Sequence, residues 1–171
     1  RQNSAEAIWF TDTKRHVSSD SLIITRFEYI NASVINNSVN RRNNYLTLNK
    51  GSRHGVEKDM GVIVNDGVVG IVHEVSAHFA SVLSLLHKDM QLSVRIKKND
   101  QIGTLSWEGG DYRYATMSYI PSHVELLPGD SIVTSGFSSI FPSDIYIGRI
   151  EDFEIRRGEN FFTARVKLAV D

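Results

Sequence analysis

The sequence lacks cysteine, has only three prolines in 171 residues, and contains no long apolar run. The absence of cysteine excludes disulfides, thiolate metal ligands and a cysteine nucleophile. A membrane-spanning helix needs about 20 consecutive apolar residues, and no segment approaches that length. What remains has the composition of an ordinary globular domain, 41% hydrophobic and 23% charged, so the chain is expected to fold around its own core.

Strong charge of either sign is also lacking, because the formal net charge is only −1. Such a chain has no broad positive field with which to capture nucleic acid or an anionic membrane surface. Basic doublets occur at Arg41-Arg42, Lys97-Lys98 and Arg156-Arg157, each among polar neighbours. We interpret them as solvated turns and predict no nucleic-acid partner.

From residue 22 onward, short runs rich in β-branched and aromatic residues alternate with clusters of Asn, Asp and Gly. About eleven strands at intervals of roughly 8–15 residues, with no helical stretch between them, predict an all-β chain of antiparallel barrels or sandwiches. The sequence shows no convincing internal repeat. The predicted strands cover residues 22–39, 45–48, 60–64, 68–75, 81–86, 92–96, 103–107, 113–119, 131–134, 145–153 and 161–170.

The clearest local signal is a hairpin, in which the apolar runs 60–64 and 68–75 flank the turn Asn65-Asp66-Gly67. Gly70 lies inside the second run. A glycine within a strand indicates a bulge or a close approach of another backbone.

One helix is predicted, over residues 4–16, because Ala5, Ile8 and Trp9 stand at i, i+3 and i+4. The segment is too short to be stable alone in water, so it would be the end of a longer helix. Residues 16–20 are read as a linker.

Ser131 follows Gly129-Asp130, an arrangement that resembles the nucleophile segment of chymotrypsin-like proteases. Those enzymes need backbone N–H groups from glycines after the serine to form an oxyanion hole, but Ile132 and Val133 follow here. We interpret this segment as a turn that leads into a strand. A serine hydrolase remains an alternative that would require a histidine and an acid beside Ser131.

Metal and cofactor chemistry finds little support in the sequence. The six histidines are scattered, and His73 and His78 are five positions apart, which puts them on opposite faces of a strand. We therefore predict no metal and no cofactor.

A ligand-binding barrel is the second alternative. The aromatic residues Trp107, Tyr112 and Tyr114 could hold a glycan strand if their rings lined one groove.

Several motifs, in order, resemble the β-region of the rod shape-determining MreC family. YLTLNKG, GV and MGVI resemble its opening, DGVVGIV its central hairpin, and SVLSLL the strand that follows. The strongest similarity is LPGDSIVTSG followed by IFP and IGRI. These motifs occupy residues 45–51, 55–56, 60–63, 66–72, 81–86, 127–136, 140–142 and 147–150.

One departure is visible, because Asp144 stands two residues after the Phe-Pro pair, where the family usually has glycine. Aspartate tolerates left-handed backbone better than most residues, so the turn is expected to survive.

The resemblance implies two small antiparallel β-barrels, preceded by the short N-terminal helix as the end of a coiled coil. It implies that residues 1–20 are the end of that helix and a linker. The first barrel would combine residues 21–46 with 129–171, and the second would comprise residues 47–128.

The resemblance also implies a non-catalytic cell-shape scaffold that organises and activates peptidoglycan synthases outside the inner membrane. The implied partners are a second copy of the chain, in a dimer or polymer, and the elongation-specific penicillin-binding transpeptidase. MreD and MreB would be reached through parts outside this chain. The full-length protein would be anchored in the inner membrane by a single helix, and no enzymatic activity is expected.

Two sets of apolar side chains are candidate contact residues. Phe137, Ile140, Phe141 and Pro142 lie in a non-strand segment and would bind a partner if exposed, although the two phenylalanines could instead plug a barrel end. Ile8 and Trp9 could pack against the helix of a second copy or fold back on their own barrel.

Overall fold

The computed structural model describes residues 4–11, 26–37, 43–64, 67–137 and 140–169, and this part of the chain is almost entirely β-structure. A single turn of 3-10 helix, η1 (Ser52–His54), interrupts the strands. Over these described ranges, no helix has the length and hydropathy needed to cross a membrane. The predicted all-β class is therefore confirmed.

Twelve strands follow one another along the described residues, and most of them coincide with predicted segments. They are β1 (Ser4–Thr11), β2 (Arg26–Asn37), β3 (Asn43–Leu48), β4 (Gly61–Val64), β5 (Gly67–Val75), β6 (Ala80–His87), β7 (Gln91–Ile96), β8 (Ile102–Ser106), β9 (Tyr114–Pro121), β10 (Ser131–Thr134), β11 (Tyr146–Ile155) and β12 (Phe161–Leu168).

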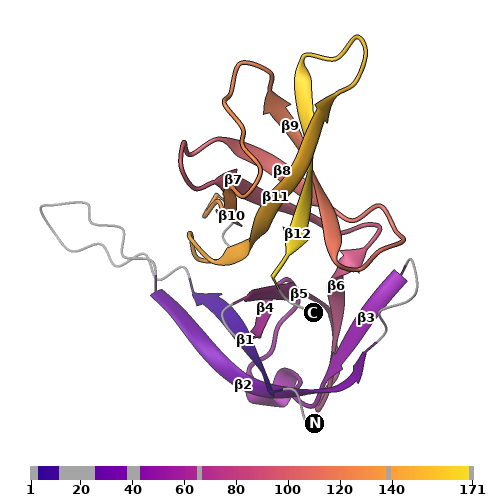
Figure 1. Cartoon of the computed structure of the whole chain (residues 1–171). Coiled ribbons are helices and arrows are strands. Elements are labelled where there is room, and N and C mark those ends of the chain that lie inside the picture. The colour runs from indigo at the N-terminus through magenta and orange to yellow at the C-terminus, as the bar shows by residue number, and fades with distance from the viewer. Residues whose placement is uncertain (1–3, 12–25, 38–42, 65–66, 138–139, 170–171) are drawn as a thin grey trace, which may run out of the picture.

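The strands form two closed antiparallel barrels with the same strand order (Figure 1). The first barrel has the order β1-β2-β3-β6-β5-β4, and β4 pairs with β1 to close it. The second has the order β7-β8-β9-β12-β11-β10, and β10 pairs with β7 to close it. Closure gives every strand of each barrel a paired neighbour on both sides over at least part of its length.

The predicted division of the chain between the barrels is wrong. The first barrel contains β1 to β6 and the second β7 to β12, so the C-terminal strands do not return to the first barrel. The physical reason is local closure: neighbouring strands pair through short connections before a distant segment is needed. The turn from His87 to Met90 joins the barrels, and its Met90 N–H donates to the His87 carbonyl at 3.0 Å.

The predicted helix is also wrong over the residues that the structure describes, because Ser4–Thr11 forms β1. This strand pairs with β2 along its whole length and with β4 over three residues. The helical spacing of three apolar residues did not determine the structure here. The β-forming run of Ile8 to Thr11 and the pairing that closes the barrel favour the strand. Residues 12–16 of the predicted helix and the linker at 16–20 lie outside the described residues.

The two barrels repeat one another in detail, although the sequence shows no repeat. Gly70 on β5 faces Val62, and Gly148 on β11 faces Ile132, with a register shift immediately after each partner. A Cβ atom on either glycine would lie 2.1 Å from a carbonyl oxygen of the following strand, that of Leu83 or Lys167. The predicted close approach at Gly70 is confirmed, and Gly148 is its equivalent.

The outer face of β4 to β6 packs against the second barrel. Ile63, Val68 and Leu85 are buried in the same apolar cluster as the second barrel's core, and Ile71 and Leu83 pack against that cluster. Because β4 and β6 are covered on both faces, neither strand has a run of exposed residues, and β4 is apolar throughout.

The register identifies the equivalent outer positions on the second barrel. Ile71 pairs with Leu83 on the first barrel, and Arg149 pairs with Lys167 at the same place on the second. The same backbone position is thus apolar where the other barrel covers it and charged where it meets water.

Candidate interaction site

The loop between β10 and β11 carries the apolar residues singled out by the sequence, and Thr134 holds its base. The Thr134 hydroxyl donates to the Pro142 carbonyl at 2.6 Å and accepts from the Ile145 N–H at 2.9 Å. The Thr134 carbonyl also accepts the Asp144 N–H at 3.1 Å. These bonds fix the end of the loop to a strand of the second barrel.

Asp144 adopts a left-handed backbone with φ of 71°, so the turn survives without the glycine usual in the family. Its carboxylate forms an ion pair with the Arg95 guanidinium on β7, and Arg95 also pairs with Asp100 at 2.5 Å. Asp144 therefore adds an ion pair with the neighbouring strand β7, which a glycine at this position could not form.

Phe141 is not available to a partner, because only 2% of it is exposed. Its ring lies against Gly61 on β4 of the first barrel, and a Cβ on Gly61 would come within 2.5 Å of the ring. The part of the contact-site prediction that includes Phe141 is therefore wrong: this side chain joins the two barrels. Gly61 was not predicted to be part of this contact, although a glycine in a strand is a signal for the close approach of another group.

Phe137 behaves in the opposite way and is 78% exposed, the most exposed of the large apolar side chains described. Gly136, with φ of 75°, turns the chain before it, and the Phe137 N–H donates to Ser135 Oγ at 3.1 Å. Ile140 and Pro142 are half-buried. The candidate contact surface is thus reduced to Phe137 with the exposed parts of Ile140 and Pro142. Phe141, which lies between the last two in the chain, is buried and does not belong to this surface.

The self-association residues Ile8 and Trp9 lie on β1 rather than on a helix. Ile8 pairs with Tyr29 on β2 and with Gly61 on β4, and Trp9 pairs with Glu28. The backbone of β1 is paired with β2 and β4 of its own barrel. The predicted packing of Ile8 and Trp9 through the face of a helix therefore does not apply.

The groups required for a serine hydrolase do not come together. Ser131 is the first residue of β10, where it pairs with Arg149, and its carbonyl accepts the Lys97 N–H at 3.0 Å. Within the described ranges, its hydroxyl makes no hydrogen bond to a histidine or a carboxylate, and no cluster of three metal-ligating side chains occurs.

The three aromatic residues of the glycan alternative do not line one groove either. Trp107 is 3% exposed, and its indole N–H donates to the Asp111 carbonyl at 3.2 Å. The Tyr114 ring is covered by the Arg165 guanidinium at 4.5 Å and approached by that of Arg113 at 5.7 Å. Hydrogen bonds from Arg113 hold the pKa of the Asp111 carboxyl down to about 2.

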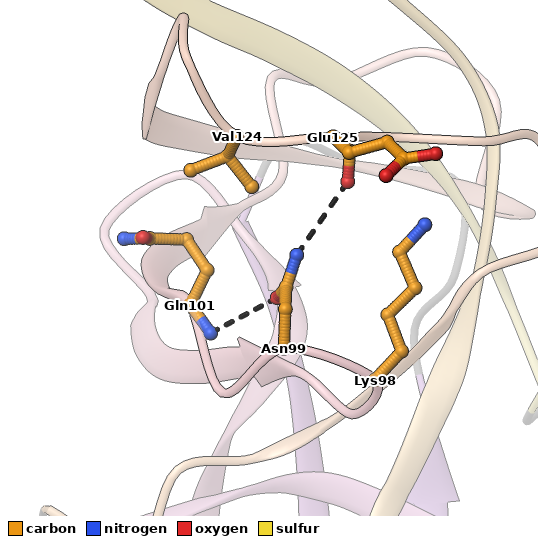
Figure 2. Close-up of a pocket in the computed structure, with 5 residues that line it drawn as sticks. All are labelled: Lys98, Asn99, Gln101, Val124 and Glu125. Carbon is orange, nitrogen blue, oxygen red and sulfur yellow. Dashed lines mark hydrogen bonds between the residues drawn. The ribbon is translucent and has the colours of Figure 1, made fainter.

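A hollow of about 510 Å³ lies between the β7–β8 turn and the segment before β10 (Figure 2). Its polar groups are already paired within the protein: Lys98 Nζ lies 2.8 Å from the Asp130 carboxylate, and the Asn99 amide donates to the Glu125 carbonyl at 3.5 Å. We interpret it as a joint between two loops, which explains the basic doublet at this turn.

The fold and the loop define the chain as a tandem β-barrel protein whose barrels are joined by an apolar interface and whose candidate site is a surface loop. The profile of "Rod shape-determining protein MreC, barrel core" matches residues 34–171. The chain belongs to this family of cell-shape-determining proteins.

One relative is the cell shape-determining protein MreC of Listeria monocytogenes, 30% identical over 151 residues, which are 86% of this chain and 51% of that protein. The chain thus spans about half the length of this relative.

Solved structures agree on the fold. "MreC Lysteria monocytogenes" superposes with a TM-score of 0.75 at 31% identity, covering 83% of this chain and 69% of that one. The major periplasmic domain of the cell shape-determining filament MreC gives 0.68 at 25%, covering 82% and 86%. MreC in a complex with penicillin-binding protein PBP2 from Helicobacter pylori gives 0.58 at 22%, covering 72% and 75%.

Proposed function

We propose that the chain is a scaffold that organises and activates peptidoglycan synthases outside the inner membrane, without catalysing a reaction itself. Membership of the MreC family carries this proposal. A relative of the same fold forms a complex with penicillin-binding protein PBP2, so the partner proposed here is the elongation-specific penicillin-binding transpeptidase. The activation is allosteric: binding favours an active arrangement of the synthase.

The proposed location is extracytoplasmic, in agreement with the periplasmic domain of the related filament protein. Anchoring by a single helix and contacts with MreD and MreB belong to parts of the full-length protein outside this chain. A homodimer or polymer remains part of the proposal, with no contact surface assigned to it.

The proposed synthase contact is the surface formed by Phe137 with Ile140 and Pro142. An aromatic side chain that stands free of its own protein is a typical binding anchor. The Thr134 hydroxyl holds Pro142 and Ser135 Oγ holds the Phe137 N–H, so Pro142 and Phe137 lose less conformational freedom on binding.

Direct binding of the chain to the extracytoplasmic part of the same organism's elongation transpeptidase tests this proposal. We expect saturable binding that Phe137→Asp weakens at least about tenfold, because one lost anchor is worth about 1.4 kcal/mol or more. The matched control is Phe79→Asp, which changes an exposed phenylalanine of the other barrel.

Equal binding by wild type, Phe137→Asp and Phe79→Asp would remove the loop from the contact. No binding by the wild type at high micromolar concentration would contradict a synthase contact within these barrels. Phe141→Asp is unsuitable as a test, since it would place a charge in the buried contact between the barrels.

A further inference from the structure

A second hollow, of about 330 Å³, lies at the end of the second barrel. We call it the tip site. Figure 1 shows the end of β9 and the β11–β12 turn on the side of this barrel away from the first barrel. The tip site is lined by Ser118, Tyr119, Arg156, Glu159, Phe161 and Thr163.

Tyr119 reaches the tip site through a bulge in β9. Phe162 pairs with Ile120 and Ala164 with Met117, so Ser118 and Tyr119 together oppose the single residue Thr163. Without the extra residue, strand alternation would turn Tyr119 toward the core, on the same side as Met117. With it, Tyr119 is 67% exposed and has a left-handed backbone with φ of 67°.

Such a backbone is strained for a bulky side chain, and strain of this kind persists where the surroundings or a function require it. Barrel closure does not require it here. On the first barrel, Leu48 pairs with Ala80 as Met117 pairs with Ala164, and β3 ends at Leu48. The second barrel continues its strand beyond this point and places an aromatic ring outside.

The ring of Tyr119 meets that of Phe161 edge to face, with centroids 6.2 Å apart and planes at 79°. Phe161 is 44% exposed, so both rings keep apolar surface open to solvent. The Arg156 side chain is free to turn toward a ligand, since its nearest ion-pair contact, with Glu154, is a loose one of 3.9 Å.

The polar groups around the rings are of mixed kind. Arg156 offers only donors, the Glu159 carboxylate offers only acceptors, and Ser118, Thr163 and the Tyr119 phenol offer both. A guanidinium beside a carboxylate gives the hollow no net charge of one sign. The matching ligand is uncharged, rich in hydroxyl groups, and has an apolar face that can lie on a ring.

We propose that the tip site binds a neutral oligosaccharide, whose C–H faces pack on Tyr119 and Phe161 while its hydroxyls bond to Arg156 and Glu159. An extended peptide would bind differently, by strand addition along β9 or β11, which are paired on one side only beyond Ser118 and Ile150. The exposed rings and the mixed polar groups of the hollow favour the sugar. This proposal does not depend on synthase binding.

Titration of the isotope-labelled chain by NMR tests the proposal, with cellotetraose and the β-1,4-linked tetramer of N-acetylglucosamine as probes. We expect saturable amide shifts confined to the end of β9 and the β11–β12 hairpin, with dissociation constants of about 1 mM or tighter. Tyr119→Asn keeps a residue that tolerates the left-handed backbone but removes the ring. This variant and Phe161→Ser should each weaken binding about tenfold or more.

Phe79→Ser, which removes an exposed ring from the first barrel, serves as the matched control and should bind the sugars like the wild type. Well-dispersed spectra of every variant establish that the fold is retained. Three results would overturn the proposal: no shifts with either sugar at about 10 mM, shifts confined to another part of the chain, or binding by both ring variants equal to that of the wild type. Tip-site shifts produced by a synthase peptide but by neither sugar would replace it with a protein contact.

Discussion

The contact between Gly61 and Phe141 joins the two barrels and leaves no room for a side chain at Gly61. A Cβ on Gly61 would lie 2.5, 2.8 and 2.9 Å from three carbons of the Phe141 ring. We predict that Gly61→Ala lowers the free energy of unfolding by about 1–3 kcal/mol, because a buried ring cannot move away without disturbing its neighbours. Urea denaturation of the chain measures this change.

A double-mutant cycle identifies the cause of that loss. In a Phe141→Leu background the clashing ring is absent, so Gly61→Ala should cost clearly less than it does alone. Equal losses in the two backgrounds would show that the glycine is required for another reason.

His87 makes the turn between the barrels sensitive to pH. Its side chain is 3% exposed, Nδ1 accepts the Asp89 N–H at 3.0 Å, and its ring meets that of Tyr45 edge to face at 4.9 Å. Burial lowers the pKa of His87 below its ordinary value of 6.5; the nearby charge of Asp89 opposes this shift, and Lys88 and His73 add to it. Nε2 is buried and has no hydrogen-bond partner among the described residues.

Because the folded chain holds a proton on His87 less readily than the unfolded chain does, stability depends on pH in a definite direction. We predict that the His87 contribution is fully present above about pH 6.5 and is lost as the pH falls toward the lowered pKa. The measurement is the urea midpoint between about pH 7.5 and pH 5. His87→Asn should keep the turn, since asparagine also accepts the N–H two residues on, and should flatten the pH dependence. An unchanged slope in this variant would assign the effect to other groups.

At the scale of elements, the hairpins β4–β5 and β10–β11 share one construction. Gly70 and Gly148 each lie where a Cβ would come 2.1 Å from the backbone of the next strand, which cannot yield as a side chain can. We predict that Gly70→Ala and Gly148→Ala each destabilise the chain by about 3 kcal/mol or more, by similar amounts. Thermal and urea unfolding measure this, with Arg149→Ala as an exposed neighbouring control expected within about 0.5 kcal/mol of the wild type.

At the scale of the whole molecule, the polarity of one outer face decides whether the barrels stay packed together. Ile71 and Leu83 correspond to Arg149 and Lys167 in the repeated architecture. We predict that the double variant Ile71→Arg, Leu83→Lys leaves both barrels folded but separates them around the turn at residues 87–90. Its NMR spectrum should stay dispersed, while small-angle X-ray scattering shows a larger radius of gyration.

A matched pair on the second barrel, Arg149→Ile with Lys167→Leu, lies on a surface open to water and should leave the radius of gyration unchanged. If the first double variant instead unfolded completely, the barrels would depend on each other for stability. An unchanged radius would mean that the remaining buried contacts, those of Phe141, Ile63, Val68 and Leu85, are enough to keep the barrels together.

Much of this protein follows from its sequence, because strand patterns and turn residues act locally. The pairing of β4 with β5, the close approach at Gly70 and the left-handed turn at Asp144 are properties of a few neighbouring residues. The predicted turn residues Asn65 and Asp66 lie outside the described residues. The motifs from YLTLNKG to IGRI likewise carry the family, and with it the expectation of two barrels.

The tertiary structure alone decided the rest, because it depends on contacts between residues far apart in the sequence. Which strands share a barrel is set by the pairs that close each half of the chain on itself, β4 with β1 and β10 with β7. Ser4–Thr11 became a strand because two partners were available to it. Phe137 and Phe141 are the same residue type four positions apart, yet one faces solvent and the other fills the contact with Gly61. Burial is a property of the packed molecule, so local pattern could predict an apolar loop but not which of its rings a partner could reach.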